Sequence, residues 1–159
     1  MSRLTLEALA SHGLEHAKRV LIGKPGAQLI PTFHIQFTNR PPAIMATPWS
    51  DDREKMAVVA SIRAAITYFR PFVDSYSFMS EAWIATQDHA PRPGERPPSE
   101  REDRREAVII TAFNKDTGFV RAYEIKRGPD ACVTELTPEK EAAKRDRFEG
   151  RLYNLFEDA

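Results

Sequence analysis

The sequence lacks the features that mark secreted and membrane proteins. Cys132 is the only cysteine among the 159 residues, so no internal disulfide can form. A chain without disulfides fits a reducing compartment. No stretch approaches the roughly 18 consecutive apolar residues that a membrane-spanning helix needs. Residues 1–16 carry charges and histidines and lack the apolar run of a signal peptide. We therefore expect a cytoplasmic protein with no membrane segment.

An excess of charge of one sign is also missing. Lys and Arg number 23, and Asp and Glu number 23, so the formal net charge at pH 7 is zero. A protein that is drawn to nucleic acid or to an anionic membrane by its overall field carries a marked positive charge. The balance of charges argues against both partners. It also leaves little repulsion between copies, so self-association near neutral pH is open to this chain.

Signatures of several enzyme classes are absent as well. The segment GKPG at residues 23–26 lacks the spacing of a phosphate-binding loop and the Ser or Thr that follows its lysine. The sequence contains no G-x-S-x-G motif, no C-x-x-C motif and no acidic metal-binding cluster. We expect no cofactor and no metal. Without a neighbouring histidine, Cys132 is expected to be a small buried thiol.

The periodicity of apolar residues predicts a single α+β domain over residues 1–159, which is a length typical of one domain. It indicates a mostly antiparallel sheet of five to six strands with three helices packed on it, in the order α-β-β-α-β-β-β-α. The predicted helices are residues 5–22, 51–70 and 138–157. The predicted strands are residues 28–38, 43–49, 73–87, 106–113 and 119–127, with residues 131–136 as a short sixth strand. In the segment 28–38, apolar and polar side chains alternate, which predicts one apolar and one polar face.

Two of the predicted helices begin with strong local signals. Asp51 and Glu54 have the spacing of a capping box. Thr137, Pro138 and Glu139 supply an N-cap, a proline at the first helical position and an acid in the first turn. Each signal predicts a helix that starts at these residues, and Thr5 is the candidate N-cap of the helix at 5–22.

Residues 88–105 are rich in proline and charge and too poor in apolar residues to bury a core, so we expect a mobile loop. The arginines at 92, 96, 101, 104 and 105 make nucleic-acid binding through residues 92–105 one alternative function. Four acidic residues lie among them, and no aromatic residue is placed to stack on bases. The composition therefore favours a solvated loop over nucleic-acid contact, and a segment that folds on a protein partner stays open.

The five residues His12-Gly13-Leu14-Glu15-His16 resemble the H-x-x-E-H zinc signature of inverzincin peptidases. On a helix, His12 and His16 lie one turn apart and could reach one zinc ion, with Glu15 activating a bound water. A small metal-dependent hydrolase is therefore a second alternative. Gly13 inside the helix and the lack of a further acidic ligand motif favour a solvated helix face, on which Glu15 interacts with Arg19.

The segment SFMSEAWIA at residues 77–85 predicts a central strand with a carboxylate in its middle. A buried Glu81 needs a partner, because an unpaired buried carboxylate costs several kcal/mol. Arg121, on the strand at 119–127, is the favoured partner, with Thr111 or a water between them and His34 as another candidate. A structural ion pair is favoured over a functional site.

The same segment also suggests a binding surface. If helices cover only one face of the sheet, Met79 and Trp83 are exposed beside the charged pair, as in a patch that binds a partner, and Trp49 extends it. Burial of the tryptophans in the core is the favoured alternative. The candidate binding residues are Trp49, Met79, Glu81, Trp83 and Arg121.

Because no catalytic constellation is visible, the expected function is a binding or assembly module without catalytic activity. Its expected partner is a second copy of the chain, forming a homodimer, or another protein.

Overall fold

The protein is described here by a computed structural model that covers residues 3–85, 92–139 and 155–156, and the backbone of residues 143–145. Its helices are α1 (Leu6–Leu21) and α2 (Asp52–Tyr68), and 3-10 turns lie at Arg70–Phe72 and Pro98–Glu100. Its strands are β1 (Thr32–Phe37), β2 (Ala43–Ala46), β3 (Val73–Ile84), β4 (Arg105–Asn114), β5 (Gly118–Arg127), β6 (Val133–Pro138) and β7 (Ala143–Arg145). The predicted α+β class is confirmed.

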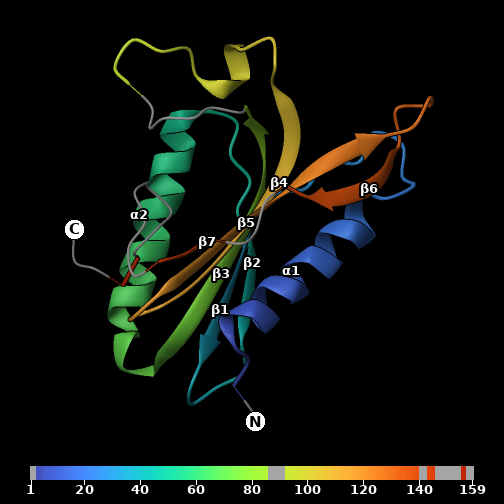
Figure 1. Cartoon of the computed structure of the whole chain (residues 1–159). Helices are drawn as coiled ribbons and strands as arrows, with labels where there is room; N and C mark the ends of the chain where they lie inside the picture. Colours follow the sequence, from blue (N-terminus) through green and yellow to red (C-terminus); the bar gives the residue numbers. More distant parts are fainter. Residues whose placement is uncertain (1–2, 86–91, 140–142, 146–154, 157–159) are drawn as a thin grey trace.

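The strands form one antiparallel sheet in the order β2-β1-β3-β4-β5-β6 (Figure 1). The short strand β7 pairs with the first residues of β5, and β6 pairs with the last ones. The longest pairing joins β3 and β4, from Ser75 opposite Asn114 to Ile84 opposite Arg105. This pair is central, so helices can pack on either side of it.

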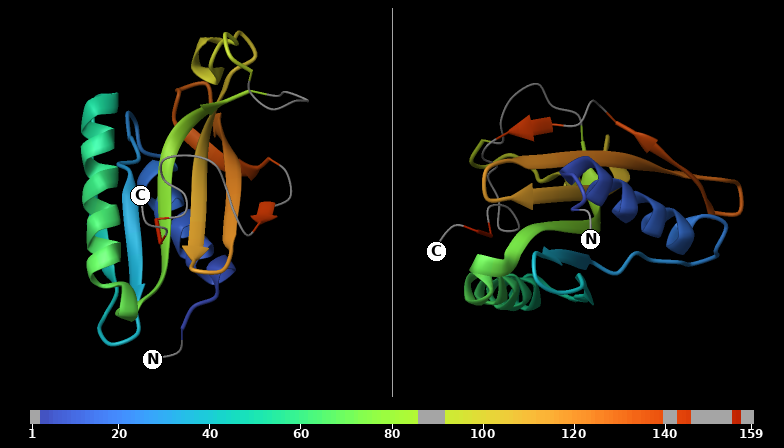
Figure 2. Two further views of the ribbon diagram at one scale, coloured as in Figure 1. Left: turned by 90° about the vertical axis from the view of Figure 1, so that its left-hand side faces the viewer. Right: turned by 90° about the horizontal axis from the view of Figure 1, so that it is seen from below.

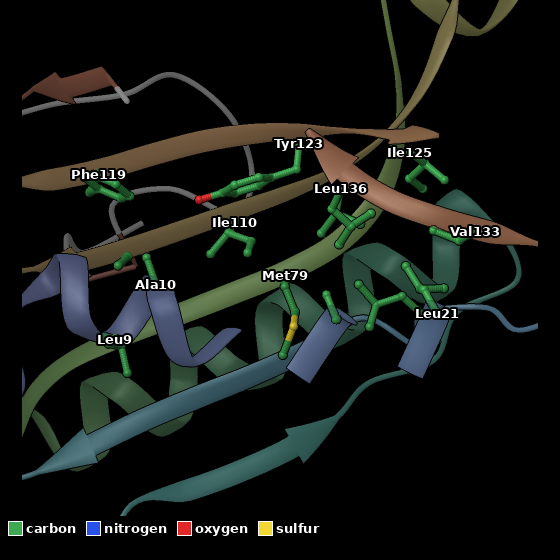
Figure 3. Close-up of a cluster of buried hydrophobic side chains, with 14 residues drawn as sticks. Leu9, Ala10, Leu21, Met79, Ile110, Phe119, Tyr123, Ile125, Val133 and Leu136 are labelled. Carbon is green, nitrogen blue, oxygen red and sulfur yellow. The ribbon is translucent and has the colours of Figure 1, made fainter. Parts of the chain in front are cut away.

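The two helices cover opposite faces of the sheet (Figure 2). Successive side chains of a strand point to opposite faces, and β3 therefore contributes Met79 to one core and Phe78 to the other. The core beneath α1 is shown in Figure 3 and includes Leu9, Leu21, Met79, Ile110, Tyr123 and Leu136. The core beneath α2 includes Phe33, Ile35, Ile62, Ile66, Tyr76 and Phe113.

Both helices begin where the sequence signals place them. The Thr5 side chain accepts a hydrogen bond from the backbone N–H of Ala8 at 3.1 Å. The Asp51 side chain accepts one from the N–H of Glu54 at 2.8 Å, and the Glu54 carboxylate accepts one from the N–H of Ser50 at 2.7 Å. The predicted capping box of α2 is therefore confirmed.

Helix α1 passes close to the sheet at Gly13. A Cβ atom at this position would lie 3.4 Å from Cγ2 of Ile110 and 3.9 Å from Sδ of Met79. The helix backbone therefore approaches β3 and β4 closely and leaves room for no more than a methyl group.

The predicted third helix at 138–157 is not confirmed. Thr137 and Pro138 lie in β6, opposite Glu124 and Tyr123 of β5, and residues 143–145 form β7. A proline is tolerated here because it ends a strand at the edge of the sheet. Pairing with β5 thus overrides the local helix signal, and most of the remaining range lies outside the described residues.

The predicted loop at 88–105 is more structured than expected where it is described, from residue 92 onward. Pro98–Glu100 form a 3-10 turn, and Arg105 already belongs to β4. The guanidinium of Arg104 donates to the carbonyl of Ser99, which ties the end of the loop to this turn. In the described part of the chain, neither helix is long and apolar enough to cross a membrane.

Candidate functional site

Glu81 is exposed, which corrects the prediction of a buried carboxylate. Its Oε1 atom accepts a hydrogen bond from the backbone N–H of Leu29 at 3.2 Å. Leu29 lies in the connection between α1 and β1, and its side chain is buried in the core beneath α1. The carboxylate therefore keeps contact with water while it satisfies a backbone donor, so it needs no buried cation.

Arg121 does not pair with Glu81. The strand register places Arg121 opposite Ile110, whereas Glu81 lies opposite Val108. The Cζ atom of Arg121 lies 5.5 Å from the centre of the Tyr123 ring instead. Among the described residues, the buried Nε atom of Arg121 has no hydrogen-bond partner.

The predicted bridging residue Thr111 and the alternative partner His34 also lie elsewhere. Thr111 is buried, and its hydroxyl donates to the carbonyl of Phe78 at 3.4 Å. It neighbours Ile110 on β4 and so points to the face covered by α2. His34 lies opposite Ser77 on β3. The strand register thus separates Glu81 from Arg121 and from His34, and the predicted ion pair is not confirmed.

The aromatic residues of the predicted patch lie on different faces of the sheet. Met79 is buried beneath α1, while the Trp49 ring stacks on Phe78, on the face of α2, with ring centres 5.9 Å apart. Trp83 is 42% exposed, and the Cζ atom of Arg104 lies 4.7 Å from the centre of its ring. Trp49, Met79 and Trp83 therefore do not form a continuous surface.

The three residues of the H-x-x-E-H motif lie on α1, where His12 and Glu15 are exposed and His16 is half-buried. Glu15 pairs with Lys18 at 3.2 Å, and Arg19 contacts only the backbone oxygen of Glu15. Within the described ranges, no three His, Cys, Asp or Glu side chains are grouped so that they could hold a metal ion.

Three of the five loop arginines are engaged within the chain. Arg101 pairs with Asp103 at 2.9 Å, and Arg104 stacks on Trp83. Arg105 pairs with Glu124 at 3.2 Å and also with Glu139. Contacts of this kind reduce the positive charge that the loop offers to a phosphate backbone.

A cleft of about 560 Å³ lies where the segment before α1 meets β1 and the turn that follows it. Figure 1 shows these segments at the lower end of the molecule. We call this feature the α1–β1 cleft. Its volume falls in the range of roughly 300–1,000 Å³ that small-molecule sites occupy. Its lining residues are Arg3, Leu4, His12, His34, Gln36, Phe37, Thr38, Asn39, Arg40, Pro41 and Pro42.

The alternation of β1 explains how polar groups come to line this cleft. Phe33 and Ile35 enter the core beneath α2, so His34 and Gln36 point to the face of α1. Helix α1 packs mainly on β3 and β4. The polar face of β1 therefore lies beside the helix instead of beneath it, and a hollow remains between them.

His34 is the most buried titratable group of the cleft. Burial, and secondarily the charge of the nearby His12, lowers the pKa of His34. Its Nε2 atom is buried and has no hydrogen-bond partner within the described residues. A polar atom left unpaired in this way costs about 1–3 kcal/mol. Because Nε2 has almost no exposed surface, a ligand would meet other atoms of the ring first.

The charged groups that line the cleft are cationic. The guanidinium of Arg40 lies over two aromatic rings, 5.2 Å from the centre of Phe37 and 4.7 Å from that of Phe69. Its Nε atom donates to the side-chain oxygen of Asn39 at 3.3 Å. The guanidinium of Arg3 forms a salt bridge with the carboxylate of Asp74, with an N–O distance of 3.3 Å. No Asp or Glu is among the described lining residues, so the cleft favours negative charge.

Sequence reasoning named two of these residues, but for other roles: His12 as a metal ligand and His34 as a partner of Glu81. The polar residues of the alternating segment 28–38 were a usable signal. Arg3, Gln36 and Arg40 were missed because their meeting depends on where α1 crosses the sheet.

Comparison of the chain with models of protein families, with curated proteins and with solved structures found no match. The functional conclusion therefore rests on the geometry and chemistry of the α1–β1 cleft.

Proposed function

We propose that this protein is a binding module without catalytic activity, and that it holds a small molecule in the α1–β1 cleft. The observation that carries this proposal is the hollow of about 560 Å³ in which apolar walls and a few polar groups converge. Leu4, Phe37 and Pro41 supply apolar surface, and His34 and Arg40 supply polar groups. This combination is typical of ligand sites.

The residues that line the α1–β1 cleft favour ligand binding over catalysis. A nucleophilic mechanism needs a hydroxyl or thiol beside a base, with a third group that orients the base. Among the described lining residues there is no Ser, Cys, Asp or Glu. The hydroxyl of Thr38 is engaged with the carbonyl of Phe72 at 3.3 Å. The two histidines therefore have neither a carboxylate to orient them nor a free hydroxyl to activate.

A fragment titration followed by NMR tests the proposal. The full chain would be exposed to a mixed set of anionic, neutral and cationic aromatic fragments. We expect some members to shift the backbone amide signals of Gln36, Thr38 and Arg40. A set in which no fragment shifts these signals would overturn the proposal.

A pair of variants shows whether such shifts arise in the cleft. Gln36→Trp places a large ring in the cleft and should abolish the shifts. Met56→Trp adds the same ring on α2, where Met56 is 46% exposed and does not line the cleft, and should preserve them. Shifts that survive in Gln36→Trp would place binding elsewhere and contradict the proposal.

The expected homodimer and the expected cytoplasmic location stay predictions. The neutral net charge and the lone Cys132 support them. The partial exposure of Trp83 needs no partner chain, because Arg104 already covers part of the ring. Sedimentation velocity over a range of protein concentrations tests the dimer.

A further inference from the structure

We propose that the α1–β1 cleft selects organic anions in which a carboxylate or a phosphate is joined to a flat apolar body. This inference rests on the proposed small-molecule function and specifies its ligand class. It stands on the sign of the charges in the cleft, on the placement of Arg40, and on the apolar walls beside it.

The charges of the lining have one sign. Arg3 and Arg40 carry a positive charge at pH 7, and the described lining offers no carboxylate to a cationic ligand. The carboxylate of Asp74 is held by Arg3 at 3.3 Å, so part of the charge of Arg3 is already compensated. Arg40 is the stronger anchor, because no acidic side chain of the described residues pairs with it.

The setting of Arg40 prepares it for an anion. Two aromatic rings, Phe37 and Phe69, lie under the guanidinium of the exposed Arg40 and favour this one arrangement of the side chain. A guanidinium that is stacked on rings still presents its N–H groups in its own plane, and these groups match a carboxylate or phosphate in a two-pronged hydrogen bond. Less conformational freedom is then lost when the anion binds.

The apolar side chains that line the cleft beside Arg40 favour a ligand that carries an apolar group. Phe37 contributes both to the stack under Arg40 and to the lining of the cleft. Leu4, Pro41 and Pro42 add further apolar surface. An inorganic anion would leave these walls in contact with water, whereas an aromatic ring attached to the anion covers them.

Probes of matched shape test the ligand class. Benzoate, benzamide and benzylamine share one ring and differ in charge, and phenyl phosphate and inorganic phosphate complete the set. We expect the full chain at pH 7 and low salt to bind benzoate or phenyl phosphate roughly tenfold more tightly than benzamide or benzylamine, as one charge-assisted hydrogen bond allows. The ratio of benzoate to phenyl phosphate affinity distinguishes carboxylate from phosphate ligands.

A matched pair of variants assigns the effect to Arg40. Arg40→Gln should weaken benzoate binding roughly tenfold and leave benzamide binding unchanged. Arg53→Gln removes the same charge from the exposed start of α2, outside the cleft, and should change neither affinity. Equal losses in both variants would mean that net charge, and not the cleft, attracts the anion, and would overturn the inference.

The outcomes also separate this inference from the proposed function. If benzamide or benzylamine binds in the cleft as tightly as benzoate, the cleft is a ligand site but not an anion site. If inorganic phosphate binds as tightly as phenyl phosphate, the requirement for an apolar body is wrong. If neither these probes nor any member of the fragment set shifts the cleft signals, the proposed function itself fails.

Discussion

His12 of α1 and His34 of β1 line the same cleft, and His12 contributes to the electrostatic environment of His34. Burial is the first cause that lowers the pKa of His34, and the charge of His12 is the second. The two residues lie 22 positions apart in the chain. They come together only because α1 crosses the sheet beside the polar face of β1.

This relationship predicts a pH dependence of stability. The pKa of His34 is lowered from 6.5, so below that pH the folded protein binds fewer protons at His34 than the unfolded chain does. The free energy of unfolding should therefore fall as the pH drops from about 7 towards the pKa of folded His34. Urea denaturation at a series of pH values measures this change.

Histidine substitutions assign the pH dependence to one side chain. His34→Gln should flatten the fall in unfolding free energy between about pH 7 and 5, because the group that titrates is gone. His16→Gln makes the same change on α1, outside the cleft, and should keep the wild-type slope. A slope that is unchanged in His34→Gln would contradict the role of His34.

Gly13→Ala should stabilise the protein by about 0.5–1 kcal/mol, because alanine favours the helix and the new methyl group fits. Its Cβ would lie 3.4 Å from Cγ2 of Ile110, which is an ordinary contact distance. Chemical denaturation measures the gain. Gly13→Leu should destabilise the protein, since a larger side chain would overlap Ile110 and Met79. A loss of stability in Gly13→Ala would contradict the finding that the space beside Ile110 accepts a methyl group.

The sequence could predict the fold where local patterns and tertiary pairing agree. The period of two in the predicted strand 28–38 identifies β1, and the capping residues Thr5 and Asp51 identify the helix starts. At the C-terminal end the local pattern and the pairing disagree. Thr137 and Pro138 have the features of a helix start, yet their backbone extends the sheet beside β5.

The candidate site was harder to predict than the fold. The alternation of residues along a strand shows which face of the sheet a side chain is on, but it does not show which helix, if any, covers that face. Glu81 points to the face of α1, as the alternation requires. It is exposed because the helix does not cover this part of β3. The same uncertainty concealed the cleft beside His34, which depends on the line along which α1 crosses the sheet.

Substitutions of Glu81 distinguish a hydrogen-bond acceptor from a buried charge. Glu81→Gln keeps an oxygen that can accept from the Leu29 N–H, so we expect a loss below about 0.5 kcal/mol in the free energy of unfolding. Glu81→Ala removes the acceptor and should cost about 0.5–1.5 kcal/mol. Thermal or chemical denaturation measures both. If Glu81→Gln destabilises the protein as much as Glu81→Ala does, the negative charge of Glu81 contributes to stability. The role of a hydrogen-bond acceptor alone is then wrong.

Arg105 holds together two carboxylates that would otherwise repel each other. It pairs with Glu124 at 3.2 Å and with Glu139, and the two carboxylates expose only 20% and 17% of their side-chain surfaces. Arg105→Ala should therefore destabilise the protein by about 1–3 kcal/mol, since a half-buried charge loses its partner. Lys126, which pairs with Glu124 at 2.9 Å, should limit the loss.

A second substitution separates repulsion between these carboxylates from loss of the Arg105 side chain. In the Arg105→Ala background, Glu139→Gln removes one of the two negative charges and should recover part of the lost stability. In the wild-type background the same substitution should cost stability, because Arg105 loses an ionised partner. A double-mutant cycle measures the coupling between the two positions. A coupling energy near zero would show that the contact of Arg105 with Glu139 does not hold the end of β6 against the sheet.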